Sequence, residues 1–148
     1  MANIRDDMPV LVRHEGDWVG TYTVIDNNGN ITDKHESHIT CQFPDAEDYP
    51  YLQTNRYQWP DGKVEEYQFP GKYCDKKLWF DTERITGQAW EANDSIIILY
   101  FSYKEIPNAY VYEMIHLSAC NHHRARTWHW FKDGQIYQRT LIQEERKR

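Results

Sequence analysis

The sequence predicts an all-β fold, an antiparallel meander of about ten strands closed into a calycin-like barrel. Segment after segment alternates polar and apolar residues with a period of two, which is typical of half-buried strands. Each segment ends at a turn rich in Gly, Pro, Asn or Asp, and no stretch shows the apolar period of a helix. Because a long meander or a sandwich leaves edge strands exposed, closure into a barrel is favoured.

The first expected strand, residues 16–25, shows the alternation most clearly. Trp18, Gly20, Tyr22 and Val24 share one face, and β-branched residues form the other. The remaining strands are expected at residues 31–43, 51–59, 64–69, 78–80, 85–91, 95–103, 110–117, 123–131 and 136–142. The strand at 95–103 is the most apolar and is expected to be the most buried.

Turn residues separate these strands. An Asn-Gly pair after the first strand supplies the positive φ angles of a tight hairpin. Pro60-Asp61-Gly62 forms a turn in which Pro sets the first corner and Gly takes the positive φ. Pro70-Gly71 is expected to end the strand at 64–69, and Asp133-Gly134 to form a two-residue hairpin.

Composition narrows the function classes. The chain has 148 residues, a length expected for one domain at 1–148, with a lead-in at 1–12 and a solvated charged tail at 144–148. Its net charge of −6 argues against a nucleic-acid partner, since phosphates need a basic face. Aromatic residues make up 15% of a chain whose mean hydropathy is −0.88, so a polar surface is expected to enclose a ring-lined interior.

The sequence also suggests where the protein works. No segment is long and apolar enough to span a membrane, and the N-terminus lacks the apolar core of a signal peptide. Cys41, Cys74 and Cys120 are widely spaced, which fits reduced thiols rather than a disulfide framework or a zinc site. A cytoplasmic protein is therefore expected.

Gly16-Asp17-Trp18 resembles the G-x-W signature of the lipocalin and fatty-acid-binding (calycin) superfamily, and Gly20 and Tyr22 follow as in lipocalin-like bacterial proteins. The resemblance implies that Trp18 closes the barrel floor and that an Arg of the last strand, here Arg139, packs over it. The chain departs from secreted lipocalins in lacking a disulfide pair, a signal peptide and a final helix. It is closer to intracellular bacterial lipocalin-like proteins, which include enzymes that modify small molecules.

Hairpin register predicts which side chains face inward. A two-residue turn at Asp133-Gly134 pairs Trp130 with Tyr137 and Trp128 with Arg139. Because the resemblance places Arg139 inside, the residues expected to share its face are Trp130, Trp128, Arg126 and Arg124.

The preceding hairpin extends this face to a charged pair. It pairs Leu117 with Arg124, Ile115 with Arg126 and Glu113 with Trp128, so Glu113 would lie diagonal to an inward Arg126. A slip of one residue would instead turn His116 or His129 inward.

The Glu113–Arg126 pair is the sharpest candidate for chemistry. A carboxylate beside an Arg in a low-dielectric pocket can be tuned to act as a base, while the Arg stabilises a developing oxyanion. The alternative is a buried structural ion pair that braces the barrel. His116 and His129 are further catalytic candidates, since either can transfer protons; the alternatives are a metal or haem ligand or an ordinary wall residue. No metal ligands stand at suitable spacing, so no metal is expected.

The remaining candidates are rings and hydrogen-bonding groups suited to phenolic or carbonyl oxygens. They are Trp18, Tyr22, Asn55, Tyr57, Glu66, Tyr67, Trp128, Trp130 and Arg139. Some of the tyrosines are alternatively ordinary cross-strand packing.

Together these features favour a cofactor-independent lyase, isomerase or cyclase of secondary metabolism. Its substrate would be hydrophobic, and aromatic or polyketide-like. The alternative is a non-catalytic carrier or sensor of a lipid, an aromatic molecule or a tetrapyrrole. A homodimer is left open, and no cofactor is expected.

Overall fold

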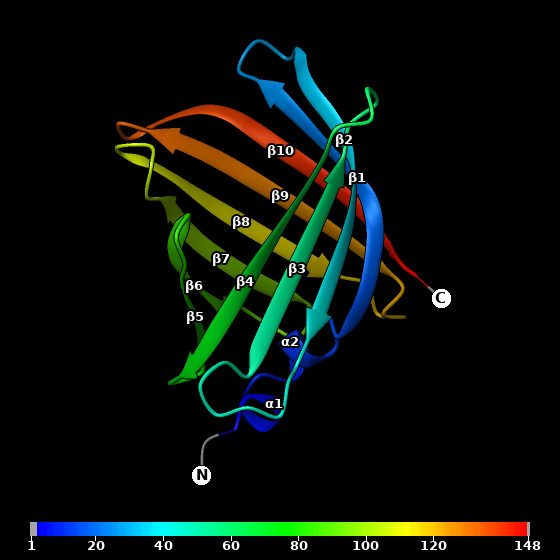
Figure 1. Cartoon of the computed structure of the whole chain (residues 1–148), viewed down its shortest axis with the longest axis vertical. Helices are drawn as coiled ribbons and strands as arrows, with labels where there is room; N and C mark the ends of the chain where they lie inside the picture. The colour runs from blue at the N-terminus through cyan, green and yellow to red at the C-terminus, as the bar shows by residue number, and fades with distance from the viewer. Residues whose placement is uncertain (1–2, 148) are drawn as a thin grey trace.

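A computed structural model describes residues 3–147 of the chain. Ten antiparallel strands follow one another around a barrel, and β1 (Gly16–Asp26) closes it by pairing with β10 (Gln135–Arg146) (Figure 1). The others are β2 (Ile31–Gln42), β3 (Tyr51–Gln58), β4 (Val64–Cys74), β5 (Lys77–Asp81), β6 (Ile85–Glu91), β7 (Ile96–Tyr103), β8 (Ala109–Leu117) and β9 (His123–Lys132). The predicted fold class is confirmed.

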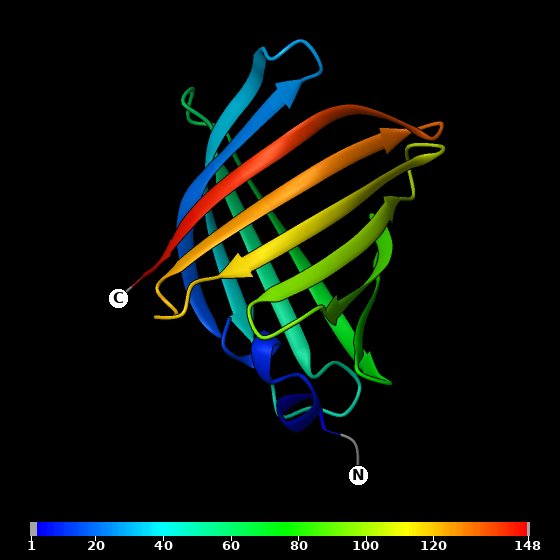
Figure 2. The same cartoon turned by 180° about the vertical axis from the view of Figure 1, so that it is seen from behind.

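Two short helices precede the barrel, where the sequence predicted only a lead-in. They are α1 (Ile4–Asp7) and α2 (Pro9–Val12), and both lie at one end of the barrel in Figures 1 and 2. Four-residue helices are too short to show an apolar period, which is why the pattern did not indicate them. Neither is long enough to cross a membrane, nor is any other helix within residues 3–147.

The helices close this end of the barrel. Met8 is fully buried, and Ile4, Val10 and Leu11 join the same hydrophobic core. The Leu11 backbone N–H donates to Glu91 at 2.8 Å, which anchors the helices to β6. Burial raises the pKa of Glu91, and the hydrogen bond from Leu11 only partly opposes this shift.

Trp18 forms the floor above these helices, as the resemblance implied. Its side chain is fully buried, and Nε1 donates to the His14 carbonyl at 3.0 Å. The guanidiniums that cover the ring belong to Arg124 and Arg146, at 4.7 and 4.4 Å from its centroid. The assignment of this role to Arg139 is wrong.

A register shift in β10 explains the error. Phe131 pairs with Ile136 as predicted, but Trp130 then pairs with Gln138 rather than Tyr137. The extra residue reverses the alternation along the rest of β10. Arg139 is therefore exposed on the outer face, and Thr140 is the buried residue opposite Trp128.

The predicted register between β8 and β9 is confirmed. Leu117 pairs with Arg124, Ile115 with Arg126, and Glu113 with Trp128. The inward face therefore carries Glu113 and Arg126. The alternative register, with His116 or His129 inside, is wrong.

β4 does not end at Pro70-Gly71 but continues to Cys74. Gly71 pairs with Tyr51 on one side and Phe80 on the other. A Cβ at Gly71 would lie only 2.7 Å from the Leu78 side chain. Because glycine has no Cβ, β4 can pack closely against Leu78 at this position and continue as a strand.

The C-terminal segment 144–148 is not a solvated tail, because β10 runs to Arg146 and Glu144 is 3% exposed. Gly20 lies opposite Glu144, and a Cβ there would come within 2.8 Å of the Glu144 side chain. The glycine thus leaves room for a buried carboxylate. Residues 1 and 2 of the expected lead-in and residue 148 of the expected tail lie outside the described residues.

Candidate functional site

A cavity of about 260 Å³ lies inside the barrel, beyond the floor. Because successive residues of a strand face opposite sides, every second residue of the wall points into it. The wall consists mostly of rings, among them Tyr57, Trp59, Tyr67, Phe101, Trp128 and Trp130. Trp130 stacks on Tyr103 with ring centroids 5.4 Å apart. Such a wall suits a flat, ring-containing molecule.

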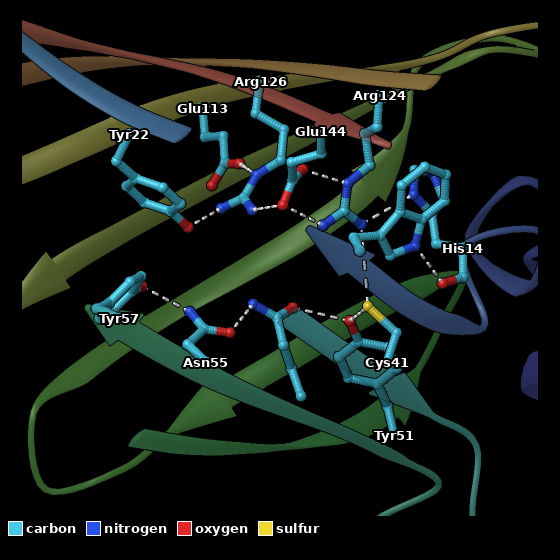
Figure 3. A network of polar contacts seen from close by, with 12 residues as sticks. His14, Tyr22, Cys41, Tyr51, Asn55, Tyr57, Glu113, Arg124, Arg126 and Glu144 are labelled. Carbon is cyan, nitrogen blue, oxygen red and sulfur yellow. Dashed lines mark hydrogen bonds and ion pairs between the residues drawn. The ribbon is translucent and has the colours of Figure 1, made fainter. Parts of the chain in front are cut away.

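Arg126 organises the inner part of the cavity (Figure 3). Its Nε donates to Glu113 at 2.6 Å, one terminal nitrogen to Glu144 at 3.2 Å, and the other to the Tyr22 hydroxyl at 2.9 Å. Burial disfavours the charged form of Arg126, but Glu113, Tyr22 and Glu144 together outweigh it and raise the pKa of Arg126. The guanidinium is therefore held between two carboxylates of the protein itself.

Arg124 continues this network toward the floor. It binds Glu144 through two hydrogen bonds of 2.6 and 3.0 Å, the bidentate geometry that guanidinium favours. Burial opposes ionisation of Glu144, yet Arg124 and Arg126 overcome it and lower the pKa of that carboxyl. With Glu113, the buried cluster contains two cations and two carboxylates, so it is electrically balanced.

A second polar row faces this cluster from β3 (Figure 3). The Tyr51 hydroxyl donates to Gln53 at 2.8 Å, the Gln53 amide to Asn55 at 2.9 Å, and the Asn55 amide to the Tyr57 hydroxyl at 2.8 Å. These residues stand at alternate positions, so all four face inward. Burial raises the pKa of Tyr57, which stays a neutral hydroxyl. The inner part of the cavity thus offers hydrogen bonds without net charge.

Most of the predicted site residues meet here. The cavity is lined by Glu113, Arg126, Tyr22, Asn55, Tyr57, Tyr67, Trp128 and Trp130. Trp18 instead lies in the floor beneath the cavity, and Arg139 is exposed outside the barrel. Glu66 also faces outward, because the inward carboxylate of β4 is its neighbour Glu65.

His116 and His129 lie on the outer face of the barrel. His116 is exposed, and His129 pairs with Tyr112, whose ring is 46% exposed. We expect His116→Ala and His129→Ala to change the free energy of unfolding by no more than about 0.5 kcal/mol. Neither should alter ligand affinity, and urea unfolding with a binding titration would check both expectations. A loss of affinity in either variant would place a ligand on the outer face.

Several residues of the cavity and its surroundings were missed. Glu144 completes the buried network by binding Arg124, which was expected on the inward face but not as a site residue. The His35 ring packs against Trp59 in a tilted arrangement, with the ring centroids 4.4 Å apart. His35 lies two residues before the buried Ser37 and therefore on the same inward face of β2, so the period-two alternation could have identified it. Arg84 also lines the cavity, but it lies in a turn, where the alternation does not indicate which way a side chain points.

Solved structures share this barrel along nearly the whole chain. A protein of unknown function of the DUF3598 family from Nostoc punctiforme superposes with a TM-score of 0.70 at 18% identity, over 93% of this chain and 49% of that one. This chain therefore spans about half the length of the Nostoc protein.

Two further structures cover the barrel from end to end. The S-type phycobiliprotein lyase CPES from Guillardia theta has a TM-score of 0.72 at 15% identity, over 93% of this chain and 90% of its own. Rv2717c from M. tuberculosis has a TM-score of 0.68 at 12% identity, with 96% and 98% covered. At such identities the likeness shows the fold alone, a calycin-like barrel.

Sequence comparison gives the family directly. None of the curated proteins matches the chain. The family model described as domain of unknown function (DUF3598), N-terminal, matches residues 5–148. Since the match covers almost the full sequence, this chain belongs to the DUF3598 family.

Proposed function

We propose that the barrel binds a hydrophobic, ring-containing small molecule in its central cavity. The observation that carries this proposal is the cavity of about 260 Å³, walled by aromatic rings and closed at one end by the floor around Trp18. Pockets for drug-sized ligands usually enclose about 300–1,000 Å³. The cavity therefore suits a molecule of a few rings, or one end of a longer molecule.

The inner polar groups indicate how such a ligand is oriented. Asn55 and Tyr57 offer an amide and a hydroxyl, and Glu113 accepts a hydrogen bond from Arg126 through Oε2. The arginines there are already paired with carboxylates, so an uncharged O–H, N–H or carbonyl group fits this end better than an anion does. The likeness to a phycobiliprotein lyase adds an open-chain tetrapyrrole to the candidate ligands.

The test is to fill the cavity. Leu99 lines it, so Leu99→Trp should lower the affinity for anilinonaphthalene sulfonate or biliverdin by about tenfold or more. Ile98→Trp is the matched control, because the neighbouring side chain points to the outer face. Isothermal titration calorimetry would measure both. Equal affinities in the two variants, or no binding of either probe to the wild type, would contradict the proposal.

A second candidate function is acid–base catalysis on the bound molecule by a lyase, isomerase or cyclase. It is supported by Glu113, a buried carboxylate that lines the cavity. Glu113→Gln should then retain ligand binding and abolish turnover, scored by mass spectrometry of a ligand that co-purifies with the protein. Turnover at the wild-type rate would remove Glu113 from the mechanism. Arg126 already donates to three protein groups, which favours a bracing role for it over an oxyanion contact.

A further inference from the structure

Arg84 lies at the opposite end of the cavity from the floor. It precedes Ile85, which pairs with Tyr103 at the end of β7 that is remote from the helices. Its guanidinium carbon stands 3.8 Å from the centroid of the Tyr67 ring, a close cation–π contact. Arg84 lines the cavity and also a smaller adjoining pocket that includes Trp130. We call this end the mouth.

Arg84 has no directly bonded counter-ion within residues 3–147. Its guanidinium makes no hydrogen bond and no ion pair there, and its side chain is half-buried. Its charge acts at longer range on Glu65, where it adds to the hydrogen bonds from Lys63 and Tyr67 in lowering the pKa of that carboxyl. Glu65, on the same side of the mouth, is bound by Lys63 at 2.9 Å and by the Tyr67 hydroxyl. Glu105 also lines the adjoining pocket, but it is exposed and forms no ion pair with a described residue.

Stacking on Tyr67 fixes the guanidinium while leaving its N–H edge available. A planar guanidinium held in this way is prepared for bidentate contact with a carboxylate, because little further side-chain entropy is lost on binding. Arg126 differs, since Glu113 and Glu144 already take its N–H groups. The two ends of the cavity therefore call for different ligand groups, an anion at the mouth and a neutral polar group inside.

The strand register separates these two ends. Tyr103 pairs with Ile85 near Arg84, and Leu99 pairs with Glu113. Tyr103 lies four positions after Leu99 along β7, which corresponds to about 13 Å along the strand. A single elongated molecule of two or three rings spans that distance.

We propose that the ligand carries a carboxylate at the end held in the mouth and that Arg84 binds it. This inference rests on the proposed function and names the ligand class, an elongated aromatic carboxylate whose other end is uncharged. Arg84 is then a specificity-determining residue. It selects against neutral molecules of the same shape.

Biphenyl carboxylate and biphenyl carboxamide are probes of the same shape that differ in charge. The wild type should bind the carboxylate about tenfold more tightly than the carboxamide. Arg84→Gln should remove this preference by weakening the carboxylate while leaving the carboxamide unchanged. Lys104→Gln is the control, because it removes a charge near the mouth from an exposed residue paired with Asp81. Calorimetry in low and high salt would measure the affinity of each of the two probes for the wild type and for the two variants.

The outcomes separate the two proposals. Equal binding of both probes to the wild type would overturn the role of Arg84 and leave the binding function standing. Equal losses for both probes in Arg84→Gln would also overturn it, since Arg84 would then act by packing on Tyr67. Binding of neither probe to the folded wild type would overturn both proposals. A preference lost in Arg84→Gln and kept in Lys104→Gln would support the inference.

Discussion

Replacing Arg126 by Met should lower the free energy of unfolding by about 3–5 kcal/mol, because the change leaves a buried carboxylate without its counter-ion. That carboxylate is Glu113, which is 2% exposed and bonded among the described residues by Arg126 alone. Glu144 is better protected, since Arg124 still binds it through two hydrogen bonds. Urea unfolding followed by circular dichroism would measure the loss.

A double variant separates the ion pair from the bulk of the Arg side chain. Arg126→Met combined with Glu113→Gln should recover much of the lost stability, since no uncompensated charge then remains at that position. Arg139→Met is the matched control, because the same substitution on the outer face should change stability by no more than about 0.5 kcal/mol. A double variant no more stable than Arg126→Met alone would show that the pair does not act as a unit.

The same pair shows how far the sequence predicts the site. The pairing that sets Glu113 diagonal to Arg126 required only the alternation along two strands and the length of the loop between them. Both are local properties, and the wrong register would have exposed the apolar face of Leu117. The ten strands follow from similarly local evidence, the turn residues and the period of two. The choice of the inner face of Glu113 and Arg126 rested on an inward Arg139, and it is correct only because the extra residue in β10 turns Arg139 outward and cancels that error.

The errors arise where the structure depends on distant contacts. The extra residue in β10 reverses the face of Arg139, and no turn residue marks it. Glu144 is read as solvated from composition, yet two arginines of β9 and the space beside Gly20 make its burial possible. Charge compensation of this kind is a property of the folded barrel, so a local pattern cannot indicate it.

His14 should make the barrel sensitive to mild acid. The ring is 2% exposed, and its Nδ1 accepts a hydrogen bond from Arg124 at 3.2 Å. Burial, and then the charges of Arg124, Arg126 and Arg146, lower the pKa of His14 well below its usual value. A proton added at Nδ1 would face the Arg124 guanidinium, so the folded state holds the ring neutral.

The direction of the pH dependence follows from this shift. Below about pH 6.5 the unfolded chain binds a proton at His14 that the folded chain does not, so the free energy of unfolding falls as pH falls. The slope approaches about 1.4 kcal/mol per pH unit below that value, as long as the folded chain keeps His14 unprotonated. Glu144, whose pKa is lowered, adds its own loss only below about pH 4.3, the usual value for a free Glu.

His14→Asn isolates this contribution. The Asn oxygen can take the place of Nδ1 as acceptor for Arg124, but it does not titrate, so urea unfolding should show a flatter dependence between pH 7 and pH 5. His123→Asn is the control, because this histidine is exposed on the barrel surface and should leave the slope unchanged. If His14→Asn kept the wild-type slope, the acid sensitivity would have another source. A flatter slope would show that His14, buried beside Arg124, is a source of the acid sensitivity.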